Sequence, residues 1–185
     1  MAFKKNTVMI MRAPSQCGKT LYANKAKAYL GSEGVECKIV SADNYFVNEH
    51  NEYRFDPSKL AIAHNQCFGN FMRIVTSKPA SSARVVIVDN TNTRRWEYEN
   101  YKLLALHMGW DVVLYEILPE TREGLLTVLG RYNGHDVPKE VITRQWVEFQ
   151  ADCSSTALPE NRTKRVRIWP ASINGAGLLD KKHLQ

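Results

Sequence analysis

Long apolar runs and clustered cysteines are both missing from this 185-residue sequence. No apolar stretch approaches the roughly 18 residues that a membrane-spanning helix needs, and no apolar region near the N-terminus precedes a signal-cleavage site. The four cysteines, Cys17, Cys37, Cys67 and Cys153, lack the spacing of zinc ligands, and a chain of this size does not need disulfides. We therefore expect no membrane association and a protein that works in a reducing cytoplasm, the host's if the chain is viral.

The sequence also has no low-complexity tract and no internal repeat. Its 25 Lys and Arg residues against 19 Asp and Glu give a formal net charge of +6 and a pI near 9.2. This mild positive charge is compatible with an anionic partner such as a nucleotide or a nucleic acid. The length predicts one main domain, with enough chain to bury a full core.

The most informative stretch covers residues 7–20. A short apolar run typical of a buried strand breaks at Ala13-Pro14, ends in Gly18-Lys19-Thr20, and is followed by a helical pattern. This is the order of a phosphate-binding P-loop, in which loop N–H groups hold phosphate, the lysine reaches the β- and γ-oxygens, and the hydroxyl binds Mg²⁺. We therefore predict that ATP is bound by the loop, whose residues are Ala13, Pro14, Ser15, Gln16, Cys17, Gly18, Lys19 and Thr20.

The loop departs from the usual pattern G-x-x-x-x-G-K-[ST], because Ala13 replaces the first glycine. Alanine costs little there if the residue keeps a negative φ. An ordinary strand–turn–helix with a surface lysine is the alternative interpretation. Cys17, near the start of a helix, could be an oxidisable thiol, although a plain loop residue is the simpler interpretation.

Strands and helices alternate along the rest of the chain. We expect strands at 37–41, 84–88, 111–117 and 164–169, and helices at 20–30, 57–75, 93–108, 119–129 and 138–152. The first helix should stop at Gly31, and the second should begin with Asp56 as N-cap and Pro57 in its first position. Such alternation predicts an α/β fold with a parallel sheet of about five strands and helices on both faces.

Two acidic residues follow predicted strands directly, Asp43 after 37–41 and Asp89 after 84–88. The carboxyl ends of parallel strands form the ligand edge of an open α/β sheet. A helix N-cap or turn residue is an equally good interpretation of Asp43. Four apolar residues followed by Asp89 have the shape of a Walker B strand, whose carboxylate holds Mg²⁺, although such a run is often only a buried strand.

Together these motifs resemble those of the polynucleotide-kinase-like P-loop kinases. That group includes phage 5′-polynucleotide kinases, related phage 5-hydroxymethyluracil DNA kinases and small kinase domains of animals. The resemblance covers about residues 8–152 and is carried by residues 13–20, 41–46, 53–56, 88–92 with Trp96-Glu97, and 131–138. It implies a three-layer P-loop kinase domain over 1–169, with a small helical lid over about 119–140 and a C-terminal tail over 170–185.

The resemblance also implies roles for single residues. Lys19 would stabilise the transferring phosphoryl group, and Asp43 would accept the proton of the attacking hydroxyl. Arg131 would close over the triphosphate, so that it binds ATP and joins the catalytic residues; a surface arginine is the alternative. Thr20 would bind Mg²⁺, and Asp89 would lie near the metal and the substrate.

The resemblance fails at Phe46, where many phage 5′-kinases carry an arginine that contacts a substrate phosphate. A phenylalanine cannot pair with phosphate, but it could stack on a base. The candidate substrate-binding residues are Asp43, Tyr45, Phe46, Asn90 and Asn92.

The resemblance implies a kinase that uses ATP and Mg²⁺ and has DNA or RNA as its partner. Its acceptor would be a 5′-OH end or a hydroxymethylated base such as 5-hydroxymethyluracil in phage DNA. An inactive nucleotide-binding module and a kinase for a small metabolite are the alternatives.

Overall fold

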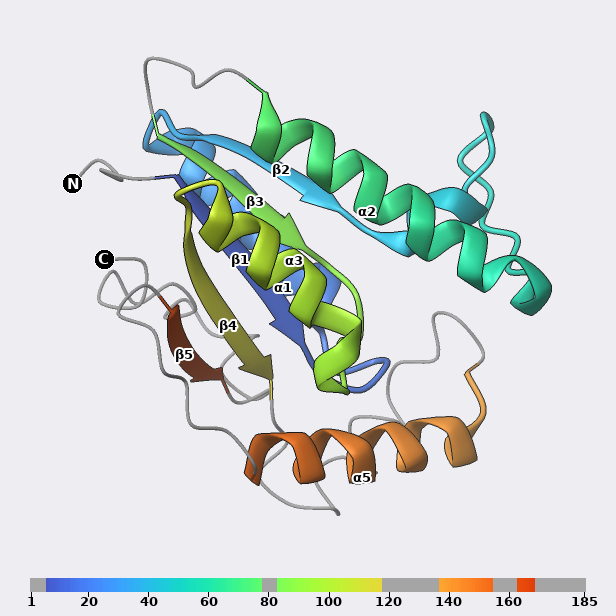
Figure 1. The fold of residues 1–185 in the computed structure, drawn as a ribbon. Helices are drawn as coiled ribbons and strands as arrows, with labels where there is room; N and C mark the ends of the chain where they lie inside the picture. Colours follow the sequence, from blue (N-terminus) through green and yellow to red (C-terminus); the bar gives the residue numbers. More distant parts are fainter. Residues whose placement is uncertain (1–5, 78–82, 118–136, 155–162, 169–185) are drawn as a thin grey trace.

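Five parallel strands form one sheet in the order β2-β3-β1-β4-β5 (Figure 1). A computed structural model describes residues 6–77, 83–117, 137–154 and 163–168 of the chain. The strands are β1 (Thr7–Arg12), β2 (Glu36–Val40), β3 (Arg84–Val88), β4 (Asp111–Ile117) and β5 (Thr163–Ile168). The predicted strands are confirmed, with bounds that differ by at most one residue.

The helices also follow the prediction closely. They are α1 (Lys19–Ser32), α2 (Leu60–Thr76), α3 (Arg95–His107) and α5 (Lys139–Ser154), with short 3₁₀ turns η1 (Ala42–Phe46) and η2 (Pro57–Lys59). Asp56 caps η2 as expected, because its side chain accepts from the N–H of Ser58. The expected stop at Gly31 is wrong: α1 continues to Ser32, and Gly34, with φ of 75°, follows its end.

Three layers result because both faces of the sheet are buried. Val8 and Ile10 of β1 point to the layer of α2 and α3, whereas Met9 and Met11 point to the layer of α1 and α5. Successive strand residues face opposite sides, so a continuous apolar strand fits between two helical layers. The predicted three-layer α/β fold is confirmed.

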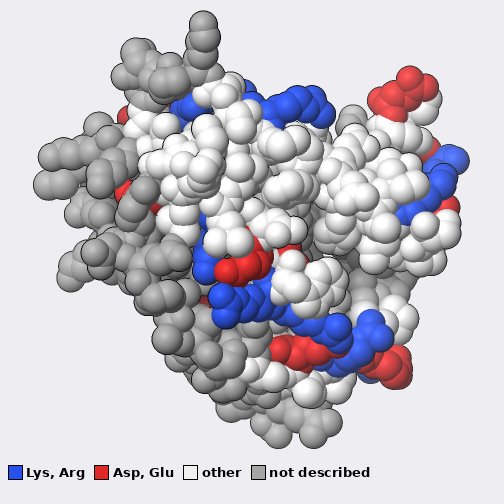
Figure 2. Space-filling view, in the orientation of Figure 1, with Lys and Arg blue, Asp and Glu red and all other residues white. Residues whose placement is uncertain are grey.

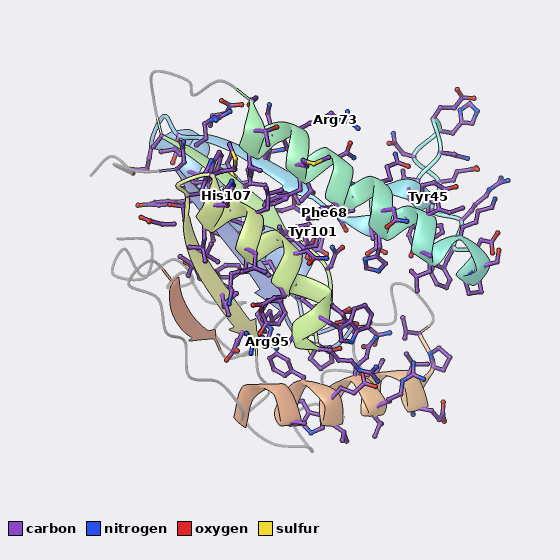
Figure 3. All side chains as sticks on the ribbon, in the orientation of Figure 1. Tyr45, Phe68, Arg73, Arg95, Tyr101 and His107 are labelled. Carbon is purple, nitrogen blue, oxygen red and sulfur yellow. The ribbon has the colours of Figure 1, made fainter. Side chains whose placement is uncertain are left out.

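The α2–α3 layer is joined by aromatic contacts. Phe68 of α2 and Tyr101 of α3 meet edge to face between the two helices, with ring centroids 5.1 Å apart (Figure 3). Trp96, by contrast, is 68% exposed at the start of α3. Within the described ranges, no helix combines the length and the apolar character that a membrane crossing requires.

The strand register brings three loops to one edge of the sheet. Ile10 of β1 lies beside Val88 of β3, so the chain leaves both strands at the same level. The N–H of Ala13 then donates to the carbonyl of Thr91 at 3.0 Å, and the N–H of Asp89 donates to that of Val40 at 2.9 Å. Strand β1 lies between β3 and β4 in the middle of the sheet, and its carboxyl end lies at the edge where open α/β sheets bind ligands.

The expected helix at 119–129, most of the expected lid, Arg131 and the expected tail lie outside the described residues. Their predicted roles stay predictions.

Candidate active site

The P-loop turns through two residues with positive φ, Gln16 at 65° and Gly18 at 84°, whereas Ala13 keeps a negative φ. The substitution of the first glycine is therefore free of backbone strain. The side chain of Ala13 is fully buried in the apolar cluster that also holds Met9 and Cys17. Alanine thus adds packing at this position and leaves the loop conformation intact.

Lys19 is buried beneath this loop, which contradicts the surface-lysine interpretation. Its side-chain Nζ donates to the carbonyls of Ala13 at 3.2 Å and Pro14 at 2.9 Å. Burial lowers its pKa, and the nearby Cys17, Asp89 and Asp43 act in the opposite direction. The ammonium group is therefore placed at the loop, and none of the described acidic residues forms an ion pair with it.

Cys17 is 1% exposed, and burial raises its pKa to about 11 even though Lys19 lies near. A thiol with such a pKa stays protonated at neutral pH and reacts slowly with oxidants. The structure therefore favours the plain loop residue over the oxidisable thiol.

Thr20 and Asp89 lie side by side, as their predicted roles require. Burial raises the pKa of Asp89, and the charge of Lys19 and a hydrogen bond from the Thr20 hydroxyl act in the opposite direction. Asp89 is 5% exposed, and its Oδ1 has no hydrogen-bond partner among the described residues. A buried carboxylate oxygen without a partner beside a hydroxyl fits the hard oxygen coordination of Mg²⁺.

No group of three His, Cys, Asp or Glu side chains that could hold a metal occurs in the part of the chain that the structure describes. Mg²⁺ is usually held by one or two protein ligands together with substrate phosphates and water. The Thr20–Asp89 pair therefore fits a magnesium–nucleotide complex better than it fits a metal cage made of protein alone.

Asp43 lies exposed in the first turn of η1, just beyond the carboxyl end of β2. The N-cap of η1 is Ser41, whose hydroxyl accepts from the N–H of Asp43 at 3.3 Å, so the N-cap interpretation of Asp43 is wrong. The Tyr53 hydroxyl donates to Asp43 Oδ1 at 3.3 Å. Burial first and the Asp43 charge second raise the pKa of Tyr53 to about 12, so Tyr53 remains a neutral donor.

A set of short hydrogen bonds holds the segment of Asp43 against that of Asp89. The Ser41 hydroxyl donates to the carbonyl of Asp89 at 2.8 Å, and the N–H of Ala42 donates to Asn90 Oδ1 at 2.9 Å. The charge of Asp43 acts to raise the pKa of both Lys19 and Asp89, so the three ionisable groups belong to one electrostatic site.

Asn90 and Asn92 are positioned differently from the prediction. Asn90 is 7% exposed and, besides its bond to Ala42, donates to Cys67 Sγ at 3.6 Å. Asn92 is 2% exposed, and its Nδ2 donates to the carbonyl of Met11 at 2.8 Å. Both amides are engaged inside the protein, so the structure gives them a positioning role in place of the predicted substrate contact.

Phe46 also differs from the prediction. It is 5% exposed, because the rings of Tyr45, Tyr53 and Phe55 lie around it with centroids between 5.0 and 6.2 Å away. A covered ring cannot stack on a base, so the exposed aromatic surface belongs to Phe55, which is 52% exposed and stacks on Tyr53 at an interplanar angle of 10°. Tyr45 is half-buried, and its predicted substrate contact stays a prediction.

Sequence reasoning missed a buried ion pair behind the P-loop. Arg12 and Glu116 lie opposite each other on β1 and β4, both fully buried, and are joined by a 2.7 Å hydrogen bond. The Arg12 guanidinium also donates to the carbonyl of Asn92 at 3.0 Å and contacts the rings of Tyr98 and Phe149. The available signal was a charged residue at the carboxyl end of two apolar runs that become neighbouring strands.

Known proteins resemble this chain in part of its sequence and in its fold. No family model matches the chain. Over 138 residues it is 34% identical to human NEDD4-binding protein 2; the match takes up 70% of this chain but spans only 7% of that protein's length.

Three solved structures resemble the fold. Kti12 from Chaetomium thermophilum in complex with ADP-AlF3 has a TM-score of 0.55 at 12% identity, covering 96% of this chain and 95% of that one. The Mycobacterium tuberculosis APS kinase CysC in complex with AMPPNP and APS has a TM-score of 0.52 at 11% identity, with 88% of each chain covered. The AvrRxo1-ORF1:-ORF2 complex with ATP has a TM-score of 0.54 at 21% identity, covering 81% of this chain and 49% of that one. The chain therefore has the fold of the P-loop kinases.

Proposed function

We propose that this chain is a kinase that uses ATP and Mg²⁺ to phosphorylate a hydroxyl group on nucleic acid. The observation that carries the proposal is the single electrostatic site at the carboxyl edge of the sheet, where Lys19, Asp89 and Asp43 act on one another. A buried cation, a buried carboxylate with an unpartnered oxygen and an exposed carboxylate are the three groups that phosphoryl transfer to an alcohol requires.

The nucleotide side of the site rests on the P-loop and the start of α1. The N-cap Gly18 provides no side-chain hydrogen bond, so the positive end of α1 would be available to a phosphate. Three structures with this fold are complexes with ATP, AMPPNP and ADP-AlF3, which supports a nucleotide at the same place. Arg131 keeps its predicted role over the triphosphate.

Thr20 and Asp89 would hold Mg²⁺, which neutralises charge on the phosphate oxygens when it is bound. Lys19 would stabilise the charge that spreads over the transferring phosphoryl group. Burial lowers its pKa and its Nζ donates to two neutral carbonyls, so a charged phosphate would be a stronger partner for the ammonium than the loop carbonyls.

Asp43 would act as the base on the acceptor side. It takes the proton of the acceptor hydroxyl, the acceptor oxygen bonds to the γ-phosphorus, and the bond to the β-phosphate oxygen breaks, so that ADP leaves and a phosphate ester forms. Asp43 is exposed, which lets a bulky acceptor approach from outside the protein. The Ser41 and Tyr53 bonds hold the Asp43 segment for this approach.

An acceptor with a planar ring fits the surroundings of Asp43. Tyr53 donates to Asp43 and stacks on the exposed Phe55, so an aromatic surface begins at the base itself. Nucleobases stack on such rings with little sequence preference. Figure 2 shows both basic and acidic side chains on the described part of one face of the molecule. Stacking would therefore have to contribute much of the affinity for a nucleic acid.

The test is phosphate transfer from γ-labelled ATP in the presence of Mg²⁺. We would offer 5′-OH oligonucleotides in parallel with 5′-blocked DNA that contains 5-hydroxymethyluracil. Label on the 5′-OH strands alone would define a 5′-end kinase, and label on the blocked strands would define a kinase for the base hydroxymethyl group.

Lys19→Met is the negative control for this assay, and Lys27→Met, an exposed change on the same helix, is its matched control. We expect Lys19→Met to lose about 10²- to 10³-fold in kcat, in line with removal of one preorganised charge from a transition state. Label on neither nucleic acid, while ATP is bound, would overturn the nucleic-acid acceptor and direct the search to small metabolites.

A further inference from the structure

The first three residues of the P-loop have no N–H group left for a phosphate. The N–H of Ala13 donates to the carbonyl of Thr91, and Pro14 has no N–H. The N–H of Ser15 donates at 2.8 Å to the side-chain amide oxygen Oε1 of Gln145, which lies 130 residues further along the chain on α5. The cradle for phosphate must therefore come from the second half of the loop, residues 16–20.

Gln145 lies on α5, and neighbouring residues of this helix on both sides of Gln145 pack against other parts of the protein. Ile142 and Trp146, the residues around it on α5, belong to the same apolar cluster as Ala13. One turn further, Phe149 contacts the guanidinium of Arg12, and Glu148 pairs with Arg94 at the start of α3. In Figure 1, α5 runs across the end of the sheet toward which β1 points. A side chain on such a helix holds its position accurately.

The loop has an unusual need for such a support. Most P-loops turn through several glycines, whereas this loop places alanine, proline and serine first. Lys19 donates hydrogen bonds to the carbonyls of Ala13 and Pro14. Gln145 accepts a hydrogen bond from the N–H of Ser15, the next residue. These contacts fix the first half of the loop, so the left-handed residues Gln16 and Gly18 can turn the second half toward a ligand.

We propose that Gln145 is a positioning residue for the nucleotide phosphates, acting through its hydrogen bond to the N–H of Ser15. The inference rests on the proposed function in one respect only, that the P-loop binds a nucleotide. Without the amide oxygen, the N–H of Ser15 loses its acceptor and the loop samples other conformations, so the binding-competent fraction falls.

The test compares Gln145→Met, which keeps length but removes the acceptor, with Gln145→Glu, which keeps an acceptor oxygen. Val147→Ala, an exposed change on the same helix, is the matched control. ADP and Mg²⁺ are titrated by calorimetry, in salt of about 0.5 M so that the added charge of Gln145→Glu is screened. Thermal unfolding without nucleotide shows whether each variant is folded.

We expect Gln145→Met to weaken ADP binding about tenfold, because the partly buried N–H of Ser15 loses its acceptor. Gln145→Glu and Val147→Ala should each remain within about threefold of the unchanged protein at the same salt, and kcat at saturating ATP should fall less than the ADP affinity.

Two results would overturn the inference alone: ADP bound equally well by Gln145→Met, or an equal loss in Gln145→Glu, because then the acceptor oxygen is not what matters. Failure of the unchanged protein to bind ADP would overturn the proposed function, and this inference with it.

Discussion

The proposed nucleotide side, around Lys19 and Asp89, and the proposed acceptor side, around Asp43, are built in opposite ways. On the nucleotide side Lys19 and Asp89 are buried, at 8% and 5% exposure, and the P-loop is hydrogen-bonded to two other segments, at Thr91 and at Gln145. On the acceptor side Asp43 is exposed, a 3.3 Å bond from Tyr53 reaches its carboxylate, and the neighbouring Phe55 is half exposed.

The difference separates the part of the site that would bind the nucleotide from the part that would select the acceptor. Burial shifts both nucleotide-side groups toward their neutral forms, lowering the pKa of Lys19 and raising that of Asp89. The folded protein therefore carries an electrostatic cost that a magnesium–nucleotide complex would relieve. Asp43 carries no such burial, which suits an acceptor that is attached to a large molecule.

The largest expected effect tests whether the acceptor side is catalytic. Asp43→Asn removes the proton acceptor but keeps an oxygen for the Tyr53 hydroxyl, so kcat should fall by about 10²- to 10⁴-fold. ADP affinity should change less than twofold, about the scatter of a titration, because Asp43 lies outside the P-loop. Glu49→Gln, an exposed change in the next loop, is the control. Normal transfer by Asp43→Asn would show that another group is the base.

The next effect concerns the buried ion pair of Arg12 and Glu116, which lies behind the P-loop. Glu116→Leu leaves the buried guanidinium of Arg12 without its carboxylate, so the free energy of unfolding should fall by about 3–5 kcal/mol. Adding Arg12→Met should recover part of that loss, because no charge is then buried unpaired. Urea unfolding of both single variants and the double variant measures the coupling. A purely additive cycle would contradict the role of the pair.

A smaller effect tests the connection between the two sides. Ser41→Ala removes the hydroxyl that joins Asp43 N–H to the carbonyl of Asp89. We expect kcat to fall about tenfold through misplacement of Asp43, with ADP affinity unchanged. Ser32→Ala, an exposed serine at the end of α1, serves as the control. If ADP affinity falls as much as kcat, Ser41 supports the nucleotide side as well.

The smallest effect tests the electrostatic cost of burying the Asp89 carboxyl group. The folded pKa of Asp89 lies above its ordinary value of 3.8, so this carboxyl's contribution to stability is present below that pH and is lost as pH rises through the raised pKa. Asp89→Asn removes the ionisation and should stabilise the protein by about 1 kcal/mol near neutral pH, while weakening Mg²⁺-dependent nucleotide binding.

Thermal unfolding from about pH 4 to about pH 8 measures this effect, where the advantage of Asp89→Asn should grow with pH. An advantage that is constant with pH would show that ionisation of Asp89 is not its cause.

Much of the fold was predictable because both faces of the sheet are buried. Runs such as 85–88 are apolar throughout, and a polar residue such as Asp89 marks where that run ends. The loop order around Lys19 and the position of Asp89 after a strand were equally visible. Helix ends were less predictable, as Gly31 shows, because one glycine within a helix costs only about 1 kcal/mol.

Side-chain partners were not predictable. Asn90 and Asn92 follow a strand in the way that ligand-binding residues do, yet each has an internal partner that lies far away in sequence. Phe46 follows a candidate base, yet three rings cover it. Burial of this kind depends on which loops meet at one edge, and only the packed chain decides that.

The sequence by itself determined the alternation of strands and helices and the local motif that places Lys19 and Thr20 at the start of a helix, because both depend on neighbours along the chain. Only the tertiary structure decided that Arg12 would face Glu116 and that Gln145 would hold the N–H of Ser15. Those contacts join residues 104 and 130 positions apart, and their geometry follows from strand order and helix packing, which no local pattern encodes.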